Sequence, residues 1–254
     1  MSRLKIFSYF TIFSFLALLV LERRGIFIPE VVLAASCESF SSFESGEERK
    51  ILIELYTSEG CSSCPPAEKW LNSLYADKGL YKDFVPVAFH VDYWDYIGHR
   101  DPMASPDFTQ RQRAYAREWK ASNIYTPEFV KAGKDWRALR RSAPKRSQDK
   151  VGNLKVQKKG RDFEVSFSSI GDFELYGALI LHGIENKIKR GENRGKSLKH
   201  NFVVNELIVK KVKGLAFESF TFKEPKLSHK EKSIVFWVSE VRSQKPIQVA
   251  GHCL

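Results

Sequence analysis

The chain has 254 residues, of which 43% are hydrophobic and 28% are charged, and its formal net charge is +11 at pH 7. This composition is typical of a globular protein and excludes a chain that is disordered throughout. A basic balance fits anionic partners, but no nucleic-acid-binding motif accompanies the charge, so we expect a solvated basic surface and no nucleic-acid partner.

Residues 1–36 predict an export signal or a membrane anchor. Arg3 and Lys5 precede an uncharged apolar run over residues 6–21, which is the layout of a signal peptide. Small residues at 34–36 offer a cleavage site, and an uncleaved anchor is the alternative, because the run is slightly shorter than the roughly 20 residues that span a bilayer. Either way we expect the rest of the chain to be periplasmic or secreted.

Four cysteines are present, at positions 37, 61, 64 and 253. In an oxidising compartment disulfides persist, and Cys61 and Cys64 pair naturally with each other. Cys37 and Cys253 flank the exported chain and would form a bridge between its ends; alternatively, Cys37 follows the sequence LAAS and is a lipid attachment site. The sequence contains no second C-x-x-C pair, so we expect neither a structural zinc site nor any cofactor.

The next elements alternate between strand and helix. A linker rich in Ser, Glu and Gly over residues 37–49 leads into an apolar strand at 51–56, a helical stripe at 67–74 and a second strand at 85–91. Ser105 and Pro106 then predict a helix N-cap and first position, and a short strand follows at 128–132. This order predicts an α/β domain over residues 50–150.

Beyond residue 150 the pattern changes to short β-branched and alternating runs, which predict a mostly antiparallel β-sandwich-like domain over residues 151–254. His182 and His200 lie in this part without partners that the sequence identifies. The sequence GENRGK at 191–196 is interpreted as a turn between strands.

Cys61 and Cys64 form the motif CSSC at the predicted junction of strand and helix. Unsatisfied N–H groups and the positive end of the helix dipole favour a thiolate there, and such settings lower a cysteine pKa from about 8.5 to roughly 3.5–7.5. We therefore predict Cys61 as an exposed nucleophile and Cys64 as the residue that resolves the mixed disulfide. Pro65 and Pro66 are tolerated only in a first helical turn. The alternative is a purely structural disulfide.

Three further residues are predicted to support the cysteines. Thr126 and Pro127 begin the strand after the long helix, where a cis-proline would bring its backbone against the dithiol and align an extended substrate. Glu54 lies on the strand that leads to the motif, where a partly buried carboxylate would accept a proton from Cys64; an edge-exposed or salt-bridged strand residue is the alternative.

The strings IELYTSEGCSSCPPAE, FHVDYWDYIGHRDPMASPDFTQRQRAYA, YTPEFV and RGENRGKSL resemble a family of secreted bacterial proteins that is catalogued as a domain of unknown function. The resemblance spans residues 50–254. It implies a thioredoxin-like core, export, and a C-x-x-C pair that matches Cys61 and Cys64, but it does not settle the activity. The basic stretch after Val130 departs from the hairpin and final helix that the resemblance implies.

His90, Asp92 and Trp94 in HVDYWDY are predicted to bind substrate, because α/β folds place ligands at the carboxyl ends of their strands. The function we expect is an exported thiol–disulfide oxidoreductase that acts on exported proteins with thiols or disulfides. Two alternatives stay open. One is a copper-binding chaperone that uses Cys61, Cys64 and His90, since thiolates and imidazole suit Cu(I). The other is a non-catalytic adaptor with a structural disulfide.

Overall fold

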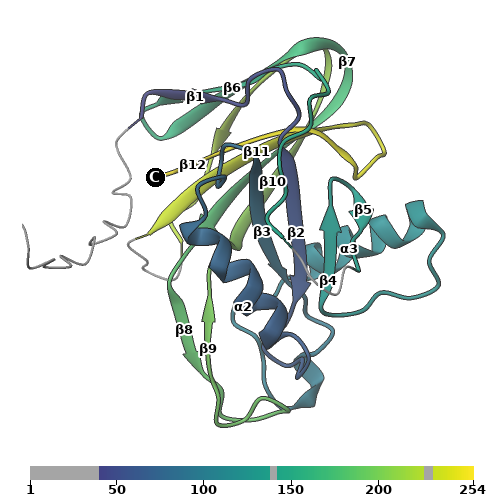
Figure 1. The fold of residues 1–254 in the computed structure, drawn as a ribbon, viewed down its shortest axis with the longest axis vertical. Coiled ribbons are helices and arrows are strands. Elements are labelled where there is room, and N and C mark those ends of the chain that lie inside the picture. Colours follow the sequence, from purple (N-terminus) through teal and green to yellow (C-terminus); the bar gives the residue numbers. More distant parts are fainter. Residues whose placement is uncertain (1–39, 138–141, 226–230) are drawn as a thin grey trace, which may run out of the picture. The chain divides into compact units, whose positions relative to one another are not determined.

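The computed structural model describes residues 40–137, 142–225 and 231–254. In these residues the chain forms twelve strands, two α-helices and two short 3₁₀ helices (Figure 1). The first strands are β1 (Ser42–Glu44), β2 (Ile51–Thr57), β3 (Phe84–His90), β4 (Glu128–Lys131) and β5 (Lys134–Asp135). The later strands are β6 (Leu154–Lys159), β7 (Asp162–Leu181), β8 (Ile184–Lys187), β9 (Ser197–His200), β10 (Val203–Thr221), β11 (Lys232–Glu240) and β12 (Pro246–Cys253). The helices are α2 (Pro65–Ser73), η1 (Leu74–Ala76), η2 (Asp95–Ile97) and α3 (Pro106–Trp119).

The structure has two strands and a helix start at the positions that local signals in the sequence predicted. The predicted strands at 51–56 and 85–91 are β2 and β3, and all seven positions of each are buried. Helix α3 begins at Pro106, and the Ser105 hydroxyl accepts a hydrogen bond from the Asp107 N–H at 3.3 Å. This satisfies one of the N–H groups that a helix start leaves without a partner. The predicted N-cap is confirmed.

One ten-stranded sheet of mixed direction runs through the described residues, in the order β1-β6-β7-β10-β3-β2-β4-β5, with β11 and β12 attached through β7. Strand β2 is parallel to β3 and antiparallel to β4. The long strands β7 and β10 pair along almost their whole length. Strands β8 and β9 form a separate two-stranded sheet that lies next to α2 (Figure 1).

The expected fold class, an α/β thioredoxin-like domain followed by a separate β-sandwich-like domain, is wrong. Among the described residues strands far outnumber the two α-helices, and strands from both expected halves share the one sheet. The connection is made by β10, which lies parallel to β3 with Val203 opposite Ala88. Hydrophobic periodicity reports which residues of a segment are buried, but it does not report which distant strand lies next to it.

The two α-helices pack on opposite faces of β2, because successive side chains of a strand point to opposite faces. Glu54 and Tyr56 share one face, where Glu54 binds Arg111 of α3. Thr57 lies on the other face and donates a hydrogen bond to Glu68 of α2. One buried apolar cluster surrounds β2 and β3, and a second lies among β6, β7 and β11.

Candidate functional site

A disulfide joins Cys61 and Cys64 in the turn between β2 and α2, with their Cα atoms 5.4 Å apart. Cys64 is the N-cap of α2, and its carbonyl oxygen accepts hydrogen bonds from the N–H groups of Ala67 and Glu68. Pro65 occupies the first helical position, where its missing N–H leaves no hydrogen bond unmade. The motif therefore lies where the sequence placed it, at a helix N-terminus.

Both sulfur-bearing side chains are buried, since Cys61 is 1% exposed and Cys64 is 0% exposed. The expected exposure of Cys61 is therefore not observed. The two residues between the cysteines, Ser62 and Ser63, are exposed, and the Ser63 hydroxyl lies 3.3 Å from the sulfur of Cys61. Solvent thus reaches the turn at its serines, while the disulfide lies beneath them.

The connection between β8 and β9 holds this turn in place. Asn193 is fully buried, and its side-chain amide donates hydrogen bonds to the carbonyl oxygens of Glu59 at 2.8 Å and Cys61 at 2.9 Å. The neighbouring Glu192 accepts a hydrogen bond from the Ser62 N–H at 3.2 Å. The sequence identified this segment only as a turn. The sequence signal for this role was an asparagine inside a polar turn, and its burial became known only from the structure.

Thr126 and Pro127 lie beside the motif, and the peptide bond between them is cis. The Ser63 hydroxyl donates to the Thr126 carbonyl oxygen at 3.5 Å, and the indole N–H of Trp94 donates to the Thr126 hydroxyl at 2.7 Å. A side chain at Gly60 would come within 3.0 Å of Trp94, so glycine allows Trp94 to pack against the turn. The structure thus brings Cys61, Thr126 and Trp94 together.

Glu54 lies elsewhere, on the face of β2 that packs against α3. Its carboxylate accepts hydrogen bonds from Arg111 at 2.8 Å, from Tyr115 at 2.5 Å and from Tyr56 at 3.0 Å. All of these side chains are buried. The geometry matches the alternative reading of Glu54 as a salt-bridged strand residue, and no described contact joins it to either cysteine.

His90 and Asp92 point to different neighbours and do not form one binding surface. The Asp92 carboxylate accepts a hydrogen bond from Thr109 of α3 at 2.6 Å. His90 is 1% exposed, and its Nδ1 lies 2.7 Å from the Asp101 carboxylate. Its other ring nitrogen, Nε2, is buried and has no hydrogen-bond partner.

A buried group of carboxylates and histidines lies next to His90. Glu68 of α2 hydrogen-bonds Nδ1 of His200, and Nε2 of His200 lies 3.1 Å from Glu59. Glu59 also contacts Nε2 of His99 at 2.7 Å, and the ring of His200 packs against that of His90 with centroids 5.1 Å apart. Glu68, His90 and His200 each present one possible metal-ligating atom within 4.8 Å of the others.

The charges in this group stabilise one another. Burial opposes the charged form of His200, but hydrogen bonds to Glu59 and Glu68 raise the pKa of His200 to about 10. Burial likewise opposes ionisation of Asp101, but electrostatic attraction to His90 and hydrogen bonds from His90 and from two backbone N–H groups hold the pKa of Asp101 below its ordinary value. Of these residues, only His90 was predicted from the sequence to belong to a binding site.

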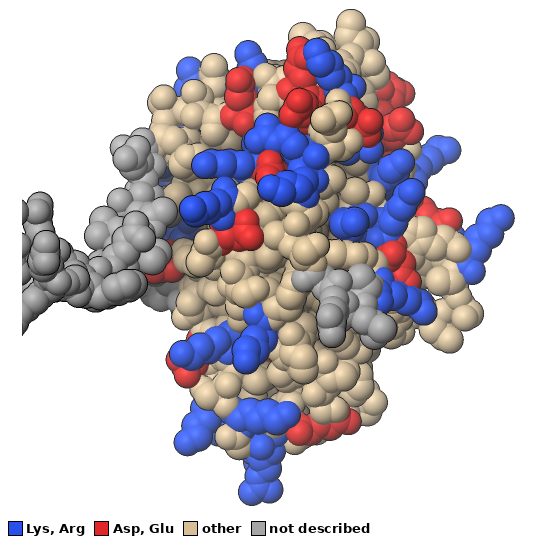
Figure 2. Space-filling view, viewed as in Figure 1, with Lys and Arg blue, Asp and Glu red and all other residues tan. Residues whose placement is uncertain are grey.

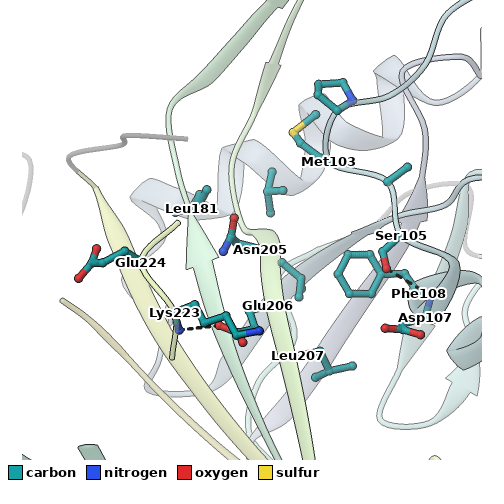
Figure 3. A pocket seen from close by; sticks show the side chains of 14 residues that line it. Met103, Ser105, Asp107, Phe108, Leu181, Asn205, Glu206, Leu207, Lys223 and Glu224 are labelled. Atoms are coloured by element: carbon teal, nitrogen blue, oxygen red, sulfur yellow. Dashed lines mark hydrogen bonds between the residues drawn. The ribbon is translucent and has the colours of Figure 1, made fainter. Parts of the chain in front are cut away.

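A separate pocket of about 460 Å³ opens between the segment before α3 and the start of β10 (Figure 3). Met103, Phe108 and Leu181 contribute apolar walls, and Glu206 accepts a hydrogen bond from the Lys223 N–H at 2.8 Å beside them. The pocket contains none of the residues that the sequence predicted to act in the site. Its lining segment begins directly after Asp101.

One protein-family model matches most of the chain. The model described as "Protein of unknown function (DUF1223)" matches residues 52–239. The chain belongs to the DUF1223 family. The matched region runs from β2 into β11, so it contains the disulfide, Glu68, His90 and His200, and the resemblance that the sequence motifs indicated is confirmed.

Two solved structures are similar to this DUF1223 chain in fold. The protein AGR_C_4864 from Agrobacterium tumefaciens is 20% identical, with a TM-score of 0.57 over 82% of this chain and 95% of that one. HBP35 of Porphyromonas gingivalis is 11% identical, with a TM-score of 0.57 over 82% of this chain and 76% of that one. No curated protein matches the chain.

The predictions for the N-terminus of this DUF1223 chain fall outside the described residues. The export signal or anchor over residues 1–36 and the pairing of Cys37 with Cys253 therefore stay predictions. Within the described ranges, no helix has the length and apolar character needed to cross a bilayer.

Proposed function

We propose that this DUF1223 protein is an exported thiol–disulfide oxidoreductase that acts on partner proteins through Cys61 and Cys64. The observation that carries the proposal is the placement of a disulfide with Cys64 as the N-cap of α2. In the reduced protein, the N–H groups and dipole at this helix end favour the thiolate, which is the form that reacts.

The exchange moves two electrons between the motif and a partner. The Cys61 thiolate attacks a disulfide of the partner, forming a mixed disulfide and releasing one partner thiolate. The Cys64 thiolate then attacks the sulfur of Cys61, which restores the Cys61–Cys64 disulfide and releases the second partner thiolate. An external thiol reductant closes the cycle; in the reverse direction the motif oxidises a partner dithiol.

Because Cys61 is buried, the exchange requires the turn to open. The contacts that must be released are those from Asn193 and Glu192 in the β8–β9 connection. The same hairpin and its connection carry six exposed basic residues, namely Lys187, Lys189, Arg190, Arg194, Lys196 and Lys199. Figure 2 shows basic side chains gathered where β8 and β9 lie. This charge favours partner segments that carry acidic residues near the reacting cysteine.

Burial of both cysteines specifically favours a second candidate, in which the disulfide only stabilises the fold of an adaptor. A disulfide that closes so short a loop contributes about 2 kcal/mol by the chain-entropy estimate. In that case reduction lowers the free energy of unfolding but supports no exchange with any added disulfide.

The test compares the full exported chain with Cys61→Ser, Cys64→Ser and the double variant, using Ser62→Ala as the matched control. After incubation with glutathione disulfide, the proposal expects a glutathione adduct on Cys61 in Cys64→Ser, identified by peptide mass spectrometry, and none at that position in the double variant. In cells, Cys64→Ser is expected to accumulate mixed disulfides with exported proteins. If Cys64→Ser forms no adduct while reduction of the wild type lowers stability, the structural role is the correct one.

A further inference from the structure

We propose that Glu68, His90 and His200 bind one divalent transition-metal ion, with Zn²⁺ as the ion their chemistry fits. Two imidazole nitrogens and one carboxylate oxygen are a ligand set that zinc uses in proteins, with a fourth position left for water or a small ligand. This inference is independent of the redox proposal, because neither Cys61 nor Cys64 is a ligand.

The observation that points to a ligand is the buried Nε2 of His90. This nitrogen has no hydrogen-bond partner, although the ring is 1% exposed, and leaving a buried polar atom unpaired costs about 1–3 kcal/mol. His90 lies with Glu68 and His200 in a set whose candidate ligand atoms are within 4.8 Å of one another. A metal ion in this set would supply the missing partner.

The residues around the three candidate ligands orient them as metal ligands are commonly oriented. Metal-bound histidines usually donate their second ring N–H to a carboxylate, which fixes the tautomer and the plane of the ring. Here Nδ1 of His90 lies 2.7 Å from Asp101, and Nε2 of His200 lies 3.1 Å from Glu59. The nitrogens that would bind an ion are therefore Nε2 of His90, which has no partner, and Nδ1 of His200, which hydrogen-bonds the proposed ligand Glu68.

A hydrogen bond from a neighbouring side chain also orients Glu68, the proposed carboxylate ligand. Thr57 donates a hydrogen bond to Oε1 of Glu68 at 2.5 Å, which leaves Oε2 directed at Nδ1 of His200. An ion would replace the hydrogen that joins these two atoms. Ligands bound at about 2.1 Å to a tetrahedral ion lie about 3.4 Å apart, so closing the site requires shifts on the order of 1 Å.

The charge of the site also favours a cation. Glu59, Glu68 and Asp101 are at most 6% exposed, and no described lysine or arginine forms a salt bridge with any of them. Histidines are their only partners that can carry positive charge. Buried carboxylates need positive partners, and a divalent ion bound in place of the shared hydrogen would balance two of the three charges.

The test measures Zn²⁺ binding to the full chain after treatment with a chelator, with the Cys61–Cys64 disulfide kept oxidised so that no thiolate competes. Isothermal titration is expected to show one Zn²⁺ per chain at this site, and the Cys61→Ser/Cys64→Ser variant is expected to bind with the same affinity. His90→Gln and Glu68→Gln are expected to abolish binding at this site. Asp101→Asn, which removes the carboxylate that orients His90, is expected to weaken it about 10–100-fold.

His182→Gln is the matched control, because His182 is equally buried but hydrogen-bonds Ser233 outside the cluster. It is expected to keep the wild-type affinity for Zn²⁺. Substitution with Co²⁺ gives a second readout, since a tetrahedral site absorbs visible light and X-ray absorption identifies two imidazole ligands. The proposal is overturned if the oxidised wild type binds no Zn²⁺, even when it is refolded with the ion, or if His90→Gln and Glu68→Gln fold and bind as the wild type does.

Discussion

Glu68 and His200 lie 132 residues apart in the chain and share a buried hydrogen bond between Oε2 and Nδ1. Glu68 belongs to the helix that Cys64 caps, and His200 is the last residue of β9. This bond therefore connects the helix that begins at the C-x-x-C motif to the hairpin whose connection contacts that motif.

The substitution Asn193→Ala is expected to expose the cysteine turn. It removes three hydrogen bonds, one of them from Lys196, and leaves the carbonyl oxygens of Glu59 and Cys61 without their side-chain donor, at a cost of about 1–3 kcal/mol. The alkylation rate of reduced Cys61 is expected to rise, and urea unfolding measures the stability. Arg194→Ala, at the adjacent exposed position, is the control and is expected to change neither. An unchanged alkylation rate in Asn193→Ala would show that the connection does not control access to Cys61.

Removing the partner of Glu54 is expected to destabilise the protein strongly. In Arg111→Met the Glu54 carboxylate loses the buried guanidinium that now lies 2.8 Å away, and breaking a buried ion pair costs about 3–5 kcal/mol. The double variant Glu54→Leu/Arg111→Met is expected to recover part of this loss, since it leaves no unpaired buried charge, while the buried hydroxyl of Tyr56 loses its acceptor.

The exposed Arg113→Met on the same helix is the control for Arg111→Met and is expected to unfold like the wild type. Thermal or urea unfolding measures all four proteins. If Arg111→Met lowers stability by no more than Arg113→Met, Glu54 is not held by this ion pair.

Glu128 is expected to make the protein less stable as the pH rises. Burial raises the pKa of Glu128 from 4.5 to about 7, so the folded chain holds this proton more tightly than the unfolded chain does. Its favourable contribution is complete below pH 4.5 and is lost as the pH rises through 7, by roughly 2–3 kcal/mol. Glu128→Gln is expected to lack this loss, so the two stabilities diverge between pH 5 and pH 8. Parallel pH profiles of the two proteins would contradict the prediction.

His182 is expected to act in the opposite direction, in acid. Burial lowers the pKa of His182 from 6.5 to about 3, so its neutral form is favoured in the folded protein. The stability it contributes is present above pH 6.5 and is lost progressively as the pH falls toward 3. His182→Gln is expected to flatten the stability profile between pH 6.5 and pH 4, measured by unfolding in urea. His252→Gln serves as a control, because His252 is only partly buried on β12. A wild-type profile in His182→Gln would contradict the prediction.

The sequence by itself determined the elements around the C-x-x-C motif and the place of the motif among them. The signals that predicted these elements are local, because each depends on residues that lie close together in the sequence. They are the apolar runs of β2 and β3, the prolines after Cys64, and the Ser105 cap of α3. The family resemblance, carried by continuous strings of residues, was equally readable.

Only the tertiary structure decided which strands pair in the large sheet and which charged side chains meet in the buried cluster. Val203 lies beside Ala88 because β10 returns to the edge of β3, and that pairing turned two expected domains into one mixed sheet. His200 had no identifiable partner in the sequence, yet folding places it between Glu59 and Glu68. Contacts across more than a hundred residues depend on how strands pair and pack, and no periodicity within a single segment encodes that choice.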